Sequence, residues 1–406
     1  MRIIYVYQYF TPPEAAGSSR AYEMARRLVA SGHEVHMVTT DRSPGAARGW
    51  RRSEVAGIQI HALGVPYSNH MGIPQRLASF GAFALAAMHK AHSLRGDVIF
   101  ATSTPLPVAI PGVYASKRGR VPMVFEVRDL WPEVPIALGA LPNPVARAAA
   151  RRLEQFAYDN AAEIVALSEG MRRGVLRRGV PDSKISVIPN CCDLEIFDVP
   201  AEDVAAFRAE HAWLGDRPML LYAGAFGLVN GVGYAARLAA EVRTLDPEFR
   251  FLLIGEGREE VMIREQARAL GVLDETLFML PSMSKPAVAV ATAAATVATS
   301  FVIDVPELWN NSANKFFDGL AAGVAVAVNH GGWQAELLEE TGAGFRLHAT
   351  DLAEAARTLV SRTHDPEWLA AARAASRQVG RERFARDDLA AQFEAVLVRA
   401  VERSQT

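Results

Sequence analysis

Residues 309–332, WNNSANKFFDGLAAGVAVAVNHGG, contain three segments in a fixed order. A polar loop rich in amide side chains (309–314) precedes a predicted short helix (315–322), and a predicted buried strand (324–328) follows. A helix that begins at such a loop offers main-chain N–H groups without intrahelical partners, together with the positive end of its dipole. Both features favour a bound anion. The pattern therefore predicts a phosphate site at the start of the helix.

Two charged side chains stand in the first turns of this predicted helix. Lys315 would place a cation at the phosphate site. Asp318 follows one turn later on the same face, where a carboxylate can accept hydrogen bonds from the two hydroxyls of a ribose. The same pattern also suits an ordinary capped helix that leads into a buried strand. These residues alone leave both interpretations open.

The composition indicates a globular protein with more than one hydrophobic core. The chain has 406 residues, of which 50% are hydrophobic, so we expect two domains. A net charge of −2 gives no excess of basic groups for a nucleic acid partner. The two cysteines, Cys191 and Cys192, are adjacent, and no Cys/His spacing typical of zinc occurs. We therefore expect a cytoplasmic protein without a structural metal.

The sequence predicts neither a signal peptide nor a membrane-spanning helix. Residues 1–7 predict a strand, and the longest apolar run (80–88) is shorter than the roughly 18 residues that span a bilayer. A helix predicted over 74–93 has an apolar face and a basic edge. This pattern is typical of a core helix, but also of a helix that lies on an anionic leaflet. Peripheral contact with the cytoplasmic face of the inner membrane therefore stays open as an alternative.

Strands and helices alternate along most of the chain. A strand at 2–7, a helix at about 19–30 and a strand at 34–40 form a βαβ unit, which predicts a parallel sheet. A second series of the same kind begins with a strand at 219–223. We therefore predict an α/β protein with two Rossmann-like, doubly wound parallel sheets. The predicted domains are 1–197 and 198–385, and a C-terminal helix (386–406) could return to the first of them.

Polar and glycine-rich loops follow the buried strands of both domains. The strand predicted at 121–127 ends in a cluster of charged residues that includes Asp129. In the second domain, glycines recur in loops 224–233 and 255–257, each directly after a strand. Ligands of open α/β sheets bind at the carboxyl ends of the strands, and glycines let the main chain approach a ligand closely. Both domains are therefore predicted to contribute to a ligand site.

Five groups of segments, in order along nearly the whole chain, form one further pattern: YFTPPEAAG (9–17) with GHEV (32–35); EVRDLWPE (126–133); SEGM (168–171) with ISVIPN (185–190); YAG (222–224); and NKFFD (314–318) with LAAG (320–323). Together they resemble glycosyltransferase family 4, which has the GT-B fold of two Rossmann-like domains that face each other across a cleft. The EVRDLWPE and NKFFD segments resemble its WbuB-like branch, which builds repeat units of O-antigen, capsule and related exopolysaccharides.

This resemblance implies retaining transfer of a sugar from a nucleotide-sugar, a UDP-sugar such as the UDP-GlcNAc or UDP-FucNAc type, without a metal. The acceptor would be a glycan, such as one linked to polyprenyl diphosphate. The implied donor-binding residues are Gly17, Ser18, Phe226, Gly227, Glu256, Met283, Asn311, Ser312, Asn314, Lys315 and Asp318. The implied acceptor-side residues are Glu126, Arg128 and Asp129, and the implied catalytic residues are Asp129, Lys315 and Asp318.

The sequence departs from the family pattern at three places. The Arg and Lys that most members carry after the first strand of the second domain fall in 225–230, between Ala225 and Asn230, where no cation occurs. The paired glutamates of the family fall on Asn310 and Asp318, and its usual histidine is replaced at Thr102. Two other functions therefore stay open: a GT-B sugar-nucleotide epimerase, and a catalytically silent GT-B subunit that binds a nucleotide-sugar or a partner.

Overall fold

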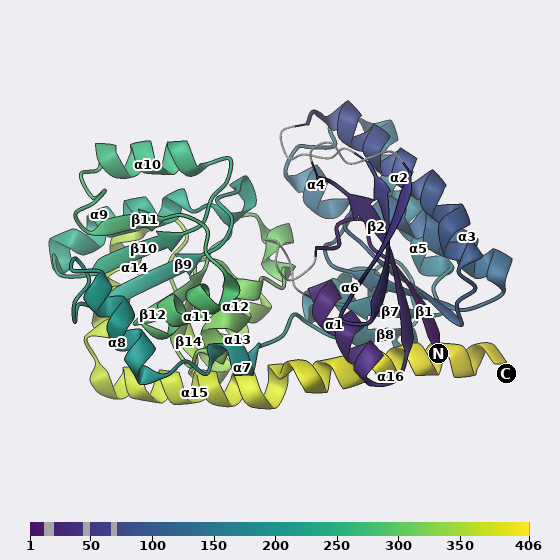
Figure 1. The fold of residues 1–406 in the computed structure, drawn as a ribbon. Helices are drawn as coiled ribbons and strands as arrows, with labels where there is room; N and C mark the ends of the chain where they lie inside the picture. Colours follow the sequence, from purple (N-terminus) through teal and green to yellow (C-terminus); the bar gives the residue numbers. More distant parts are fainter. Residues whose placement is uncertain (12–19, 44–48, 66–70, 406) are drawn as a thin grey trace. The chain divides into compact units, whose positions relative to one another are not determined.

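The computed structural model describes residues 1–11, 20–43, 49–65 and 71–405. Contacts between residues divide the chain into two units (Figure 1). Unit 1 comprises Met1–Pro189 and Asp387–Thr406, and unit 2 comprises Asn190–Arg386. The chain therefore leaves the first unit once and returns to it at the C-terminus. We expected a boundary after residue 197; by contacts, the residues that follow Pro189 already belong to the second unit.

Unit 1 is built on an eight-stranded sheet in the order β3-β4-β2-β1-β5-β6-β7-β8. The strands are β1 (Arg2–Val6), β2 (Glu34–Asp41), β3 (Trp50–Val55), β4 (Ile58–Gly64), β5 (Val98–Thr102), β6 (Met123–Val127), β7 (Glu163–Ala166) and β8 (Ile185–Val187). All neighbours pair in parallel except β3, which pairs with β4 in antiparallel register. Strand β3 could not be predicted from sequence, because its polar and largely exposed residues show no apolar alternation.

The helices of unit 1 are α1 (Arg20–Ala30), α2 (Ile73–Ser93), α3 (Ala109–Gly119), α4 (Glu133–Ala137), α5 (Pro144–Asp159) and α6 (Glu169–Leu176). Short 3₁₀ turns occur at η1 (Leu106–Val108) and η2 (Asp182–Lys184). No helix in the described part of the chain is long and apolar enough to cross a membrane.

Unit 2 is built on a six-stranded parallel sheet in the order β11-β10-β9-β12-β13-β14. The strands are β9 (Met219–Ala223), β10 (Arg250–Ile254), β11 (Leu277–Leu280), β12 (Val297–Ser300), β13 (Ala325–Val328) and β14 (Gly344–Arg346). The predicted strand at 324–328 is β13, and it is not the edge of the sheet, because β14 pairs with its outer side. Three residues, Gly-Phe-Arg, are too few to show a strand period in the sequence.

The helices of unit 2 are α7 (Leu194–Phe197), α8 (Ala201–Glu210), α9 (Gly233–Leu245), α10 (Glu260–Ala269), α11 (Lys285–Ala293), α12 (Asn314–Ala321), α13 (Trp333–Thr341), α14 (Leu352–Thr363) and α15 (Pro366–Phe384). The 3₁₀ turns are η3 (Leu228–Asn230) and η4 (Pro306–Asn310). The helix predicted at 315–322 is α12, which begins and ends one residue earlier.

Both faces of the unit 2 sheet are covered, which explains why β9, β10 and β13 are mostly apolar. Leu252 of β10 lies in one core cluster, and its neighbours Phe251 and Leu253 lie in the other. Successive side chains of a strand point to opposite faces, so a strand buried on both sides needs apolar residues at every position. The carboxyl ends of these strands, where the loops begin, are therefore left to carry the polar groups.

Helix α16 (Arg386–Gln405) packs on unit 1 from Asp387 onward. Its Phe393 is almost fully buried, and the ring meets Phe100 of β5 edge-on at 4.7 Å between ring centroids. Arg399 on the same helix donates to the buried carboxylate of Glu163 on β7, with a distance of 3.0 Å between Nη2 and Oε2. The last helix is therefore part of the core of the N-terminal unit.

We predict that Phe393→Ala destabilises unit 1, because the change removes a buried ring and leaves a cavity between α16 and β5. Comparable truncations cost about 3–5 kcal/mol. Urea unfolding followed by circular dichroism measures the loss. Gln392→Ala, on the exposed face of the same helix, is the control and should change stability by less than about 0.5 kcal/mol. Equal effects of the two changes would contradict the packing of α16.

Candidate functional site

The candidate site of unit 2 is formed by the start of α12 and the carboxyl ends of β9, β10 and β12. Helix α12 begins at Asn314, and no side chain of the described residues caps it. Ala313, the residue before the helix, is extended, and its N–H donates to Asn311 Oδ1 at 3.1 Å. Phe316 N donates to the main-chain oxygen of Ala313 at 3.1 Å, so the first-turn donors available to a ligand are the N–H groups of Asn314 and Lys315. This is the arrangement predicted from residues 309–332.

Lys315 is the cation of this site. Its Nζ donates to Oδ1 of Asn230 at 3.3 Å and lies 5.1 Å from the centroid of the Tyr222 ring. Burial lowers the pKa of Lys315 to about 8, although the negative charge of Asp318 opposes this shift. The amine is therefore charged at neutral pH, but it is poorly hydrated and available to an anionic group.

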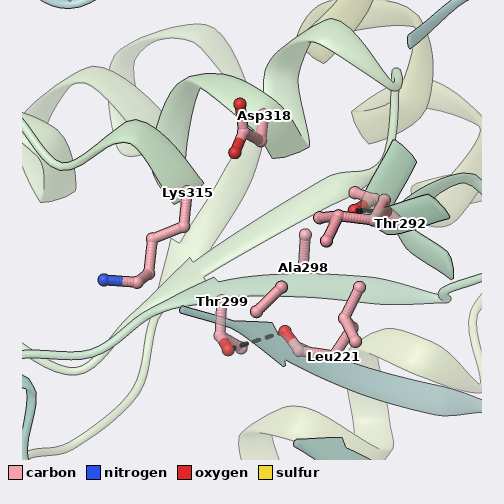
Figure 2. Close-up of a pocket in the computed structure, with 8 residues that line it drawn as sticks. Leu221, Thr292, Ala298, Thr299, Lys315 and Asp318 are labelled. Carbon is pink, nitrogen blue, oxygen red and sulfur yellow. Dashed lines mark hydrogen bonds between the residues drawn. The ribbon is translucent and has the colours of Figure 1, made fainter. Parts of the chain in front are cut away.

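A small pocket lies beneath Lys315 and Asp318 (Figure 2). Its lining also includes Leu221, Ala223, Val288, Thr292, Ala298 and Thr299. Thr299 Oγ1 uses its proton within the sheet, because it donates to the main-chain oxygen of Leu221 at 2.8 Å. The cavity has room for about one water molecule. It therefore forms the floor of the site and is too small to hold a nucleotide.

Asp318 and Lys315 leave the same helix, yet they bind different partners. Asp318 Oδ1 accepts a hydrogen bond from Lys285 Nζ, the first residue of α11, at 2.6 Å. Burial raises the pKa of Asp318, and the charge and hydrogen bond of Lys285 oppose that rise. Asp318 is 14% exposed, so it remains accessible at one side. Sequence reasoning did not find Lys285, because no motif connects α11 with α12.

The loops after β9 and β10 pack directly against each other. Phe226 N donates to the main-chain oxygen of Glu256 at 2.9 Å. Gly255 has φ +151°, and a Cβ at this position would lie 2.0 Å from the main-chain oxygen of Gly224. That distance is far below contact, so glycine is required for the two loops to meet. The loops place Gly227 and Glu256 at the same edge of the sheet.

The structure places the remaining donor-side predictions in different environments. Phe226 is buried in the core, where its ring lies 6.2 Å from that of Tyr222 between centroids. Glu256 is exposed, and Met283 and Asn314 are partly exposed. Asn311 uses its amide within the loop, where Nδ2 donates to the oxygen of Leu308 at 2.8 Å.

The last residues predicted on the donor side are Ser312, Gly17 and Ser18. Ser312 Oγ accepts from Asn190 N at 3.0 Å, so this hydroxyl is occupied within unit 2. Gly17 and Ser18 lie outside the described residues, and their predicted roles stay predictions.

In unit 1, Glu126 is an internal ion-pair partner. It is almost fully buried on β6, and its Oε1 lies 2.8 Å from Nη2 of Arg20. Its Oε2 accepts from Thr102 Oγ1 at 2.5 Å. Arg20 also donates to the main-chain oxygens of Ile188 and Pro189. Both carboxylate oxygens are occupied, so we assign Glu126 to the support of the strand ends instead of the acceptor contact that we expected.

Asp129 is the acidic side chain next to this support. Its Oδ2 accepts from Thr104 Oγ1 at 2.9 Å, and burial raises the pKa of Asp129, with Thr104 and Arg128 opposing the rise. Thr104 has φ +73°, a costly conformation for a β-branched residue that is found mainly at functional sites. Arg128 lies over the ring of Tyr7, at 5.1 Å from its centroid. No sequence motif pointed to Thr104.

Comparison with protein families identifies the chain. Residues 16–191 match the family model of the glycosyl transferase 4-like domain, and residues 203–379 match that of glycosyl transferases group 1. The two matches follow each other and together cover most of the sequence. The chain belongs to glycosyltransferase family 4. No curated protein matches the sequence significantly.

Solved structures that resemble this glycosyltransferase have the GT-B fold. HepE from Anabaena in complex with UDP-glucose has a TM-score of 0.74 and 16% identity, over 98% of this chain and 100% of that one. Sucrose-phosphate synthase from Thermosynechococcus elongatus has a TM-score of 0.79 and 17% identity, over 98% of each chain. A UDP-forming α,α-trehalose-phosphate synthase from Burkholderia xenovorans has a TM-score of 0.74 and 12% identity, over 98% of this chain and 99% of that one.

The positions at which this glycosyltransferase departs from the family pattern make specific contacts. Asn230 accepts from Lys315, and its Nδ2 donates to the main-chain oxygen of Ala225 at 2.8 Å. Thr102 donates to Glu126. Asn310 is the last residue of η4, in the loop that leads to α12. At Asn230 and Thr102, the replacement is thus integrated into the hydrogen bonding of the site.

We predict that Gly255→Ala is strongly destabilising, because the added methyl group would collide with the oxygen of Gly224. The matched control is Gly342→Ala, where φ is +72° and nothing lies within 4 Å of the added carbon. The control should cost about 1 kcal/mol from its backbone conformation. Gly255→Ala should cost at least about 2–3 kcal/mol, since strain and collision both contribute. Thermal unfolding of both variants measures the difference, and similar losses would contradict the close contact of the loops.

Proposed function

We propose that this glycosyltransferase transfers a sugar from a UDP-sugar with retention of configuration, and that unit 2 binds the donor. The observation that carries the proposal is the partly buried cation of Lys315 beside the uncapped start of α12, a combination that suits a diphosphate. HepE has been crystallised with UDP-glucose, and the trehalose-phosphate synthase is UDP-forming, which supports the choice of nucleotide.

The chemistry that we propose uses Lys315 and the N–H groups of α12 to stabilise the departing UDP. The bond between the anomeric carbon and the β-phosphate oxygen breaks, and a bond from the acceptor oxygen forms on the same face of the sugar. The leaving phosphate takes the acceptor proton. Negative charge grows on the diphosphate during this step, so donors fixed in advance lower the barrier. Asp129, held by Thr104, would orient the acceptor hydroxyl, and Arg128 would support the acceptor side.

For the acceptor, we propose a lipid-linked glycan of the polyprenyl-diphosphate kind or another glycan of cell-surface polysaccharide synthesis. The donor sugar would be of the UDP-GlcNAc or UDP-FucNAc type. The resemblance of EVRDLWPE (126–133) and NKFFD (314–318) to the WbuB-like branch supports both choices. A lipid-linked acceptor would bring the enzyme to the cytoplasmic face of the inner membrane. Helix α2, on which Leu85 is 67% exposed, is the candidate contact.

The first test of this function is UDP binding by calorimetry together with donor turnover. We predict that Lys315→Met weakens UDP binding. The same change should lower turnover by a factor of about 10²–10³, which is the loss seen when a donor to a developing charge is removed. UDP affinity of the parent should fall as pH rises through about 8, because Lys315 then loses its proton and its charge. Lys184→Met, a lysine of unit 1 outside the site, serves as the control.

The outcomes of this test separate the candidate functions. A parent protein that fails to bind UDP or any nucleotide-sugar contradicts the proposal. Tight binding without turnover, over a panel of nucleotide-sugars and lipid-linked acceptors, would instead favour the catalytically silent subunit. Epimerisation of a free nucleotide-sugar without transfer would favour the epimerase. A Lys315→Met protein within threefold of the parent would remove Lys315 from the mechanism.

We also propose that transfer needs no metal ion. The charge of the diphosphate would be balanced by Lys315 and the helix dipole, and the carboxylate that lies closest along α12, Asp318, is already bound by Lys285. We predict that turnover is unchanged, within experimental error, after dialysis against excess EDTA. Mg²⁺ and Mn²⁺ are added back separately as controls. Loss of activity that either ion restores would show that a metal takes part.

A further inference from the structure

Four charged side chains of unit 2 form a continuous chain of ion pairs that begins at Asp318. Lys285 Nζ lies 2.6 Å from Asp318 Oδ1 and 3.6 Å from Asp193 Oδ2. Asp193 in turn is paired with Nε of Arg386. Positive and negative charges alternate, so the chain carries no net charge. The pairs connect α12 to α11 and to the segments in which unit 2 begins and ends.

The members of this chain differ in their burial. Asp193 and Arg386 are nearly buried, Asp318 is 14% exposed, and Lys285 is 32% exposed. Neighbouring main-chain contacts hold the inner end: Cys192 N donates to the oxygen of Phe384 at 2.8 Å, beside the Asp193–Arg386 pair. A buried ion pair that loses one partner leaves an uncompensated charge, which is far more costly than an exposed one. Lys285 therefore compensates the charges of two carboxylates, those of Asp318 and Asp193.

The charge of Asp318 depends on Lys285 more than on its other neighbours. The charged groups that face it are Lys285 of α11, Asp193 and Arg386 from the ends of unit 2, and Lys315 on its own helix. Burial and Asp193 favour the neutral carboxyl group, whereas Lys285 and Arg386 favour the carboxylate. Lys285 is the group among these that also forms a hydrogen bond to Asp318.

The hydrogen bond from Lys285 occupies one oxygen of Asp318 and leaves the other for a ligand. Among the described residues, Oδ1 accepts from Lys285, and Oδ2 makes no hydrogen bond to any of them. A carboxylate fixed at one oxygen and open at the other is oriented before a ligand arrives, which lowers the cost of binding. Lys285 also contacts the face of Phe197 at 5.1 Å from the ring centroid, which restricts its own position.

We propose that Lys285 is a positioning residue of the donor site: it keeps the Asp318 carboxylate ionised and oriented so that its second oxygen accepts from a ribose hydroxyl. The inference rests on the proposed function, because it assumes that Asp318 contacts the ribose of the donor. Lys285 does not touch the donor. It replaces part of the hydration that Asp318 loses on burial, and it does so from a different helix.

A double-mutant cycle tests the proposal. UDP is titrated by calorimetry into the parent, Lys285→Met, Asp318→Asn and the double variant at pH 5.5, 6.5 and 7.5. Loss of Lys285 raises the pKa of Asp318, so the carboxylate is lost as pH falls. We expect Lys285→Met to weaken UDP binding about tenfold at pH 5.5 and less at pH 7.5, relative to the parent at the same pH. In the Asp318→Asn background, Lys285→Met should change affinity by less than twofold, because the group it acts on is gone.

Two further variants complete the design. Lys285→Arg keeps the cation and should remain within about threefold of the parent at every pH. Arg264→Met removes an exposed pair with Glu260 on α10 and should leave affinity unchanged. Thermal unfolding of every variant reports folding. If Lys285→Met fails to fold, Lys285→Gln takes its place in the cycle, since it keeps a donor but not the charge.

The possible results are distinct. Equal losses from Lys285→Met in both backgrounds, or a loss that does not depend on pH, would overturn the proposal and show a structural role for Lys285. In that case the parent still binds UDP, and the proposed function stands. A parent that does not bind UDP would overturn both together. A pH-dependent loss that disappears in the Asp318→Asn background would establish Lys285 as a positioning residue.

Discussion

The proposed donor side of this glycosyltransferase depends on how two opposite charges on one short helix are kept apart. Lys315 and Asp318 lie one turn apart on α12, where pairing with each other would be the simplest way to compensate them. Instead Asn230 accepts from Lys315, and Lys285 donates to Asp318. A neutral partner leaves the positive charge of Lys315 uncancelled, whereas a cationic partner neutralises Asp318. The start of the helix therefore stays attractive to a diphosphate.

Compensation of charge also distinguishes two acidic residues of unit 1, Glu126 and Asp129. Glu126 lies on β6, and Asp129 follows two residues after the end of this strand. Glu126 has its two oxygens taken by Arg20 and Thr102 and supports the ends of the strands. Among the described residues, Asp129 accepts one hydrogen bond, from the hydroxyl of Thr104, whose backbone is in a costly conformation. The acid with fewer internal partners is the better candidate for a substrate contact, since its remaining capacity is not used by the fold.

The residues that replace the family's usual side chains fit this account. Asn230 occurs in the loop where most members carry cations, and it binds the cation of α12 instead of supplying one. Thr102 takes the place of a histidine and completes the hydrogen bonding of Glu126. In both cases a neutral residue forms a hydrogen bond with a charged one. Within unit 2, Lys315 is thus the cation in the first turn of α12, and Asn230 is its neutral partner.

The sequence by itself determined the α/β class, the two parallel sheets, most strands and the family, because buried strands and glycine loops leave local patterns. It also singled out Lys315, Asp318 and Asp129, whose positions follow from the ends of single elements. It could not show the antiparallel strand β3, the short strand β14 or the burial of Phe226, since these depend on neighbouring strands. Lys285, Arg20 and Thr104 emerged from the tertiary structure alone. Their partners lie 33, 106 and 25 residues away, and a hydrogen bond over such a separation is set by packing and not by local sequence.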